Sequence, residues 1–237
     1  DENLPKNLSV EDILVYSSNI GSVKIGQIIG QEKLKQFLET IGILNQLSFD
    51  IEEIGKPIPF RWRECKLKTV SYGHGITTTP IQLAKGYAIL ANGGYDIKPT
   101  LIKKEFSNFK KKRILNKNLS SQMIPIFRKV VEKGTATLSD VEGYEVGGKT
   151  GTAQIVENGA YTNKKINTFA SIFPSSDPEY VLIVLLEDTK LSKDYLYKYR
   201  NKPGSYKGTP FNTAGWTSVE ISGKIIDKIG PILATKY

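Results

Sequence analysis

A five-residue run at positions 148–152, Gly-Lys-Thr-Gly-Thr, combines groups that could bind an anion. The lysine supplies a cation, and the two threonines supply hydroxyls and N–H groups, which suits a carboxylate-bearing ligand lying along a strand. Strands disfavour glycine, and a glycine inside one often marks the close approach of a ligand or of another backbone. The candidate ligand-binding residues are therefore Lys149, Thr150, Gly151 and Thr152.

A Gly-Lys-Thr triplet also occurs in phosphate-binding P-loops, where a helix follows the motif directly. Here Ala153-Gln-Ile-Val156 continues with the composition of a strand. The sequence therefore favours a strand-borne site over a P-loop.

A second polar group, Ser17-Ser18-Asn19, interrupts a stretch whose apolar residues have helical spacing. Serine and asparagine side chains compete for backbone hydrogen bonds, so the group by itself is typical of a helix cap or a break between helices. It is also the only Ser-x-Asn in the chain. Both a structural role and a role in a site are open for Ser17 and Asn19 on this basis.

The two motifs occur together in one known group of proteins. Lys-Thr-Gly and Ser-x-Asn are two of the three motifs of penicillin-binding proteins and class A β-lactamases, the third being Ser-x-x-Lys. Here they follow the order that is usual in that group. The chain resembles this family over nearly its whole length, and the further similar segments are 71–84, 133–136, 169–174, 177–184, 213–217 and 223–226.

The resemblance points to class B, monofunctional penicillin-binding proteins, of the septal, cell-division type found in alphaproteobacteria. It implies an α+β fold, penicillin-binding transpeptidase or β-lactamase-like, in which an antiparallel sheet packs with helices. Residues 1–237 would form one partial transpeptidase domain, from just before the Ser-x-Asn motif to the C-terminal helix, with the N-terminal part missing.

The nucleophilic serine of the family stands in a Ser-x-x-Lys motif upstream of Ser-x-Asn. The single Ser-x-x-Lys of this chain runs from Ser107 to Lys110, after Ser-x-Asn and inside a lysine-rich stretch without helical spacing of apolar residues. We interpret it as a chance match. We therefore expect the nucleophile to lie outside this chain, and the polypeptide alone to be inactive.

The resemblance also implies a role for each matched residue in a D,D-transpeptidase. Ser17 would relay a proton, Asn19 would hydrogen-bond the peptide amide, and Lys149 would hold the Ser17 hydroxyl and add positive potential. The residues that would bind the terminal carboxylate of the substrate are Thr150, Gly151 and Thr152. The backbone N–H of Thr152 would form half of an oxyanion hole.

The same resemblance implies the cellular setting. The substrates would be peptidoglycan stem peptides, which β-lactam antibiotics mimic, and the reaction would need no cofactor. The protein would act at the periplasmic face of the bacterial inner membrane, with its membrane anchor outside this chain, beside membrane proteins of the division machinery.

Two alternatives stay open at the level of sequence. One is a β-lactamase-like acyl hydrolase, although class D enzymes resemble Ser-x-Val where this chain has Asn19, and class A enzymes resemble Ser-Asp-Asn where it has Ser18. The other is a non-catalytic interaction fragment, which would suit a chain without the nucleophile. Rapid deacylation of a penicillin would distinguish the first from a transpeptidase.

Composition argues against other classes of site. The net charge is +9, but a lysine-rich run such as 110–113 is usually a solvated loop, so we expect no nucleic-acid partner. Cys65 and His74 are the only cysteine and histidine, too few for a structural zinc site. His74 occupies the variable position of a Gly-x-Gly turn, and we interpret it as a turn residue and not as a catalytic base.

The elements expected around these motifs are helices, then an antiparallel meander, then a helix, which indicates an α+β layer structure. The expected helices begin at Ser9, Ile20, Glu32, Thr79 and Ser120 or Ser121, and a last one covers about 213–233. The expected strands cover about 145–156, 167–173 and 179–187. Pro57 and Pro59 predict an irregular stretch over 45–70, and 100–118 is expected to be a loop or hairpin.

Overall fold

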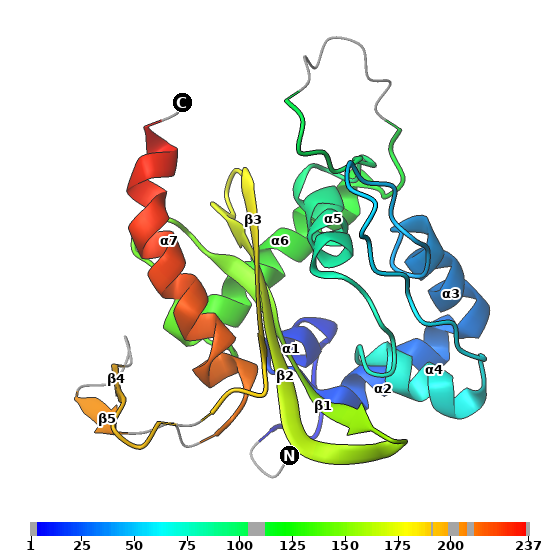
Figure 1. Ribbon diagram of the computed structural model, residues 1–237, viewed down its shortest axis with the longest axis horizontal. Helices are drawn as coiled ribbons and strands as arrows, with labels where there is room; N and C mark the ends of the chain where they lie inside the picture. Colours follow the sequence, from blue (N-terminus) through cyan, green and yellow to red (C-terminus); the bar gives the residue numbers. More distant parts are fainter. Residues whose placement is uncertain (1–3, 104–111, 191, 199–203, 208–210, 236–237) are drawn as a thin grey trace. The chain divides into compact units, whose positions relative to one another are not determined.

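The computed structural model describes residues 4–103, 112–190, 192–198, 204–207 and 211–235 (Figure 1). They form two compact units, Asp1–Met123 and Ile124–Tyr237. The prediction of one partial domain over 1–237 stays a prediction. In the described part of the chain, no helix has the length and apolar character that crossing a membrane requires.

The first unit is built from helices. They are α1 (Val10–Val15), α2 (Asn19–Ile29), α3 (Gln31–Thr40), α4 (Glu64–Ser71) and α5 (Pro80–Ala91), followed by the start of α6 (Lys117–Glu132). The predicted caps are confirmed: the Ser9 hydroxyl accepts a hydrogen bond from the backbone N–H of Asp12, and Thr79 and Gln82 form a capping box before α5. Such caps satisfy N–H groups that a helix start leaves unpaired.

Gln82 does more than cap its helix. Its side chain is almost fully buried, and its Nε2 donates to the carbonyl oxygens of Gly42 at 3.0 Å and Asn45 at 2.6 Å. The same side chain therefore fixes the start of α5 and the segment after α3. Buried amides need such partners, because an unpaired polar group costs about 1–3 kcal/mol in the interior.

The prediction of an irregular stretch over 45–70 is wrong for its last part, where α4 forms. The two prolines restrict the chain only near positions 57 and 59, and the helix starts after them. α4 packs closely against α2: a side chain at Gly26 would meet the Ser71 hydroxyl. An ion pair of 2.8 Å between Glu64 and Lys68, one helical turn apart, adds local support.

The start of α6 also differs from the prediction. The helix begins at Lys117, three residues before Ser120, because the Asn116 side chain accepts a hydrogen bond from the N–H of Asn118 at 2.9 Å. Within the stretch 100–118, residues 104–111, which include Ser107 and Lys110, lie outside the described residues. At its end, Arg113 bridges to Tyr95 and places its guanidinium 4.3 Å from the centre of that ring.

The second unit contains the predicted meander. Its strands are β1 (Gly147–Glu157), β2 (Ala160–Phe173) and β3 (Tyr180–Glu187), which form an antiparallel sheet in the order β1-β2-β3 (Figure 1). A short pair, β4 (Leu196–Lys198) and β5 (Ser205–Lys207), forms a separate sheet. The three predicted strands are confirmed, and β2 begins seven residues before the predicted start because a hairpin at 157–160 extends its pairing with β1.

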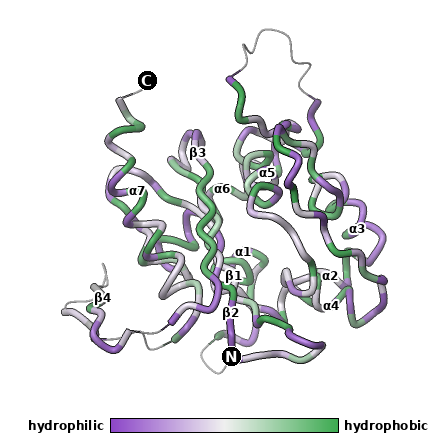
Figure 2. The backbone as a smooth tube through the Cα atoms, viewed as in Figure 1, coloured by the Kyte–Doolittle hydropathy of each residue, from purple (hydrophilic) through white to green (hydrophobic). Residues whose placement is uncertain are grey.

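The final segment forms two elements where one helix was expected. These elements are the 3₁₀ turn η3 (Ala214–Trp216) and the helix α7 (Ser218–Ala234). α7 packs on β2 and β3, and it also contacts an earlier 3₁₀ turn, η2 (Thr137–Ser139). Figure 2 shows hydrophobic and hydrophilic residues alternating along α7, as a helix with one buried side requires. Gly223 permits this packing, because a side chain there would lie 2.8 Å from the Leu138 carbonyl oxygen.

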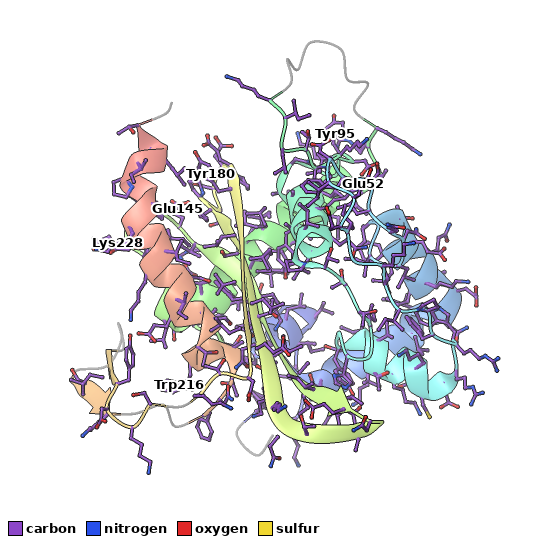
Figure 3. The ribbon with its side chains drawn as sticks, viewed as in Figure 1. Glu52, Tyr95, Glu145, Tyr180, Trp216 and Lys228 are labelled. Carbon is purple, nitrogen blue, oxygen red and sulfur yellow. The ribbon has the colours of Figure 1, made fainter. Side chains whose placement is uncertain are left out.

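The core of this unit lies between the sheet and α7. Its fully buried members include Phe169, Ile172, Val219 and Ile226. At one end of the sheet, the Phe173 and Tyr180 rings stack with their centres 5.3 Å apart. Nearby, the Glu145 backbone carbonyl oxygen accepts a hydrogen bond from the N–H of Ser175. Trp216 lies near the opposite end of the sheet (Figure 3).

Candidate functional site

The predicted binding residues lie on β1, which is an edge strand of the described three-stranded sheet. Lys149 pairs with Ala170 of β2, and Thr152 pairs with Asn167. An edge strand leaves one row of backbone N–H and C=O groups unused by its own sheet, and an extended peptide can pair with such a row. The motif is therefore placed where a peptide-like ligand could bind along the strand.

Thr150 and Thr152 share one face of β1, because side chains alternate along a strand. The Thr150 and Thr135 hydroxyl oxygens are 2.7 Å apart. The Thr152 hydroxyl accepts a hydrogen bond of 2.9 Å from the N–H of Ala214 in η3. Both hydroxyls are thus held by defined neighbours, and Thr152 itself is exposed.

Lys149 extends to the other face of β1, which it shares with Gly151. Its Nζ donates to the Thr150 carbonyl oxygen at 3.1 Å. Burial lowers the pKa of Lys149 from its usual value of 10.5 to about 8, because a low-dielectric environment disfavours the charged form. The amine therefore still carries a positive charge at neutral pH and loses it in the mildly alkaline range.

The two glycines of the motif differ in whether the surrounding structure leaves room for a side chain. A side chain at Gly148 would lie 2.4 Å from the Ala170 carbonyl oxygen and 2.8 Å from the Phe169 ring, so the packing of β1 on β2 excludes one. At Gly151 the nearest atom to an added Cβ is the Thr168 carbonyl oxygen at 4.0 Å, an ordinary contact. The described fold needs Gly148, whereas Gly151 keeps open a stretch of exposed strand.

The Ser-x-Asn motif forms the turn between α1 and α2. Ser17 has a φ of 56°, in the left-handed region that non-glycine residues seldom occupy. Ser18 is the N-cap of α2, and its hydroxyl accepts from the N–H of Gly21 at 3.1 Å. Asn19 is the first residue of α2 and is exposed. The helix-cap interpretation is thus confirmed for Ser18, and Ser17 and Asn19 flank the cap.

Comparison with known proteins identifies the family. Residues 1–207 match the penicillin binding protein transpeptidase domain. This chain belongs to that family. The chain is 28% identical to the probable peptidoglycan D,D-transpeptidase FtsI of Caulobacter vibrioides, over 97% of the chain and 39% of that protein. It is 32% identical to the stage V sporulation protein D of Bacillus subtilis, over 76% of the chain and 30% of that protein. The chain spans about two fifths or less of the length of these curated relatives.

Solved structures confirm the predicted α+β fold of this chain. The apo transpeptidase domain of penicillin-binding protein 3 from Burkholderia pseudomallei superposes with a TM-score of 0.79 at 23% identity, covering 95% of this chain and 65% of that one. Penicillin-binding protein 3 from Mycobacterium tuberculosis, complexed with aztreonam, gives a TM-score of 0.76 at 23% identity, covering 94% and 52%. The α+β architecture with an antiparallel sheet is therefore the fold of these domains.

Within this transpeptidase family chain, the structure brings the predicted residues together in two groups. Lys149 to Thr152 lie on one strand of the second unit, and Ser17 and Asn19 lie on one turn of the first. Sequence reasoning did not predict the neighbours that hold the threonines, Thr135 and Ala214. The similar segments 133–136 and 213–217 contained both residues, and their position beside the matched motifs was the available signal.

The structure also bears on three other features: a P-loop, the role of His74 and a metal site. Gly143 stands at the spacing of a P-loop glycine, but Gly147–Glu157 is a strand and not the helix that a P-loop requires. His74 lies between Gly73 and Gly75, which both have positive φ, in agreement with its interpretation as a turn residue. Among the described residues, no group of three acidic, histidine or cysteine side chains is arranged to hold a metal ion.

Proposed function

We propose that the full-length protein is a serine-type peptidoglycan D,D-transpeptidase, which cross-links stem peptides and is acylated by β-lactams. The observation that carries the proposal is the edge strand β1, which offers the Lys149 amine and the threonine hydroxyls beside the open position of Gly151. The names of the relatives support it, since the Caulobacter vibrioides protein is a probable peptidoglycan D,D-transpeptidase.

The proposed reaction proceeds in two steps. A serine hydroxyl, expected outside this chain, attacks the penultimate D-Ala carbonyl, and the terminal D-Ala leaves as its nitrogen gains a proton. An amine of a second stem peptide then attacks the acyl-enzyme ester, forms the new amide and releases the serine. Covalent catalysis of this kind divides one difficult step into two easier ones.

Residues of this chain would serve both steps. Thr150, Gly151 and Thr152 would bind the carboxylate of the substrate along β1, and the Thr152 N–H would stabilise the oxyanion. A donor of this kind contributes about 2.7–4 kcal/mol to the transition state. Lys149 would hold positive potential at the site, Ser17 would relay the proton to the leaving amine, and Asn19 would bind the peptide amide.

The proposal that the two groups serve one reaction has its own test. In the full-length protein, the rate of acylation by a fluorescent penicillin would be compared for Ser17→Ala, for Lys149→Ala and for the double variant. Residues that act on one proton transfer are not additive, so the double variant should be little slower than the slower single one. Fully additive losses would mean that the groups act separately.

We further propose the cellular role. Septal cell division in an alphaproteobacterium is supported by the match to the Caulobacter vibrioides protein over 97% of this chain. On this proposal the enzyme acts at the periplasmic face of the inner membrane, together with membrane proteins of the division machinery. Depletion in the source bacterium should then give undivided filaments, whereas loss of rod shape would indicate a role in elongation.

The decisive experiment is acylation by a fluorescent penicillin. The full-length protein should form a stable adduct, and Lys149→Ala should slow its formation by about a hundredfold or more without unfolding the protein. Lys164→Ala is the matched control, because Lys164 is exposed on the β1–β2 hairpin and pairs with Glu157. The 237-residue polypeptide alone should form no adduct.

The other outcomes are equally informative. Fast deacylation of the adduct would indicate a β-lactamase-like hydrolase. A folded full-length protein that is never acylated would contradict the enzyme and favour a non-catalytic interaction domain. An unchanged acylation rate in Lys149→Ala would remove Lys149 from the site.

A further inference from the structure

A pair of amide side chains lies beside the binding strand. Asn167 of β2 is completely buried and is the pairing partner of Thr152. Its Nδ2 donates to Asn212 Oδ1 at 2.6 Å, and Asn212 Nδ2 donates to the Thr189 carbonyl oxygen at 3.0 Å. The amides therefore connect the middle of the sheet to the segment that precedes η3.

The hydrogen-bond chemistry fixes the direction of this chain. Asn212 must turn its NH₂ group to the Thr189 carbonyl, which can only accept, so its oxygen faces Asn167. Asn167 must then offer its own NH₂ group, and its Oδ1 has no partner among the described residues. Leaving a buried carbonyl unpaired is unfavourable, so an apolar residue at 167 would suit a purely structural role better.

The segment held by Asn212 reaches the binding strand two residues later. There the N–H of Ala214 donates to the Thr152 hydroxyl oxygen at 2.9 Å. Since this bond uses the hydroxyl as an acceptor, its own hydrogen is left to donate. The next residue packs tightly as well, because a side chain at Gly215 would lie 2.7 Å from the Thr135 carbonyl oxygen.

We propose that Asn167 and Asn212 are positioning residues for the Thr152 hydroxyl. They hold the segment 212–214 so that the Ala214 N–H occupies the acceptor side of this hydroxyl, which commits the hydroxyl to donating toward a ligand carboxylate. This rests on the proposed function, in which Thr152 binds the carboxylate of the substrate. The amides touch no substrate themselves and act through Thr152.

The test compares benzylpenicillin with its methyl ester, which lacks the carboxylate, as acylating agents of the full-length protein. Thr152→Val should lower the preference for the acid over the ester by about ten- to a hundredfold, as expected for a hydrogen bond to a charged group. Asn212→Ala and Asn167→Leu should lower it by about tenfold, with the ester rate nearly unchanged. Thr152→Val combined with Asn212→Ala should lose no more than Thr152→Val alone.

Ser171→Ala is the matched control. Ser171 is also fully buried on β2, and its hydroxyl donates to the Leu182 carbonyl oxygen at 3.1 Å, away from Thr152. This variant should lose stability and keep the acid preference. Equal slowing of acid and ester in Asn212→Ala, or an unchanged preference in both amide variants, would overturn the positioning role.

A second measurement is independent of catalysis. Hydrogen exchange at the Ala214 amide should be at least tenfold faster in Asn212→Ala and in Thr152→Val than in the wild type and in Ser171→Ala. Unchanged exchange in Asn212→Ala would overturn the proposal even if the protein is a transpeptidase. If the wild type is never acylated, the proposed function fails, and the exchange data alone decide whether the amides hold this contact.

Discussion

The turn at Ser17–Asn19 and the strand at Lys149–Thr152 place candidate residues in opposite ways. In the turn, Ser17 carries a side chain in a backbone conformation that glycine would adopt more easily. In the strand, Gly151 lacks a side chain where the described packing would accept one. In both motifs the candidate residue is therefore not the residue that local folding would favour.

Each motif also contains a neighbour that the fold does need. Ser18 caps α2, and Gly148 allows β1 to pack on β2. The comparison teaches that adjacent residues of one motif differ in what folding requires: Ser18 and Gly148 support the fold, whereas Ser17 and Gly151 are not the residues that it favours. Departures from local preference are expected at functional positions. Paired substitutions at adjacent or related residues test this division.

The largest effect on stability is expected for Gly148→Ala. The added methyl group would clash with the Ala170 carbonyl oxygen, and the free energy of unfolding should fall by about 3 kcal/mol. Gly151→Ala should change it by less than about 1 kcal/mol and should slow acylation by about tenfold or more, because the methyl group would meet the ligand. Urea unfolding and penicillin acylation of the full-length protein measure both. Equal stability losses would remove the distinction between the two glycines.

The turn offers the corresponding pair. Ser18→Ala removes the N-cap and should lower the free energy of unfolding by about 1 kcal/mol while acylation is retained. In Ser17→Gly the backbone can keep its left-handed conformation without the steric strain that a side chain causes there. The free energy of unfolding should therefore be unchanged or up to about 1 kcal/mol higher. The same change should slow acylation by about a hundredfold, as expected for the loss of a proton relay. A Ser17→Gly variant with normal acylation would make this turn purely structural.

The pH dependence of acylation tests Lys149 more finely. Its pKa of about 8 means that the ammonium is present below pH 8 and is lost above it. Acylation by benzylpenicillin should therefore decline by up to about tenfold per pH unit above pH 8. Acylation by the methyl ester, which has no carboxylate to attract, should decline less. Identical profiles for acid and ester would contradict the electrostatic role of Lys149.

The smallest effect is expected on α7, at a titrating group outside both motifs. Burial raises the pKa of Glu220 from 4.5 to about 7, so the folded state favours the protonated carboxyl. Its contribution to stability is full below pH 4.5 and is lost as the pH rises through 7. Glu220 is only partly buried, and solvent screening weakens the effect of burial on its charge, so we expect a loss of only about 1 kcal/mol.

Glu220→Gln should remove that part of the pH dependence in urea unfolding measured at pH 5 and pH 8. It should leave the alkaline decline of acylation unchanged. This result would distinguish the titration of Glu220 on α7, which affects stability, from that of Lys149 on β1, which affects acylation. A shifted acylation profile in this variant would show that Glu220 takes part in the chemistry.

Local signals predicted much of the fold. The caps at Ser9 and Thr79 and the three strands of the meander depend on residues close together in the sequence, and all are confirmed. α4 was missed because its sequence has few apolar positions, and contact with α2 stabilises it. Likewise, α7 was expected to include η3, and the separate turn exists because Ala214 contacts Thr152 of a distant strand.

The sequence by itself determined the family, the strand that carries Lys149 to Thr152 and the position of Ser-x-Asn at a helix break, because each rests on residue types at fixed short spacing. Only the tertiary structure decided which glycine the packing requires and that burial lowers the pKa of Lys149. It also decided that the Ala214 N–H bonds the Thr152 hydroxyl and that Asn167 bonds Asn212 nearby. These properties depend on segments up to 62 residues apart meeting in space, and a linear pattern contains no information about that distance.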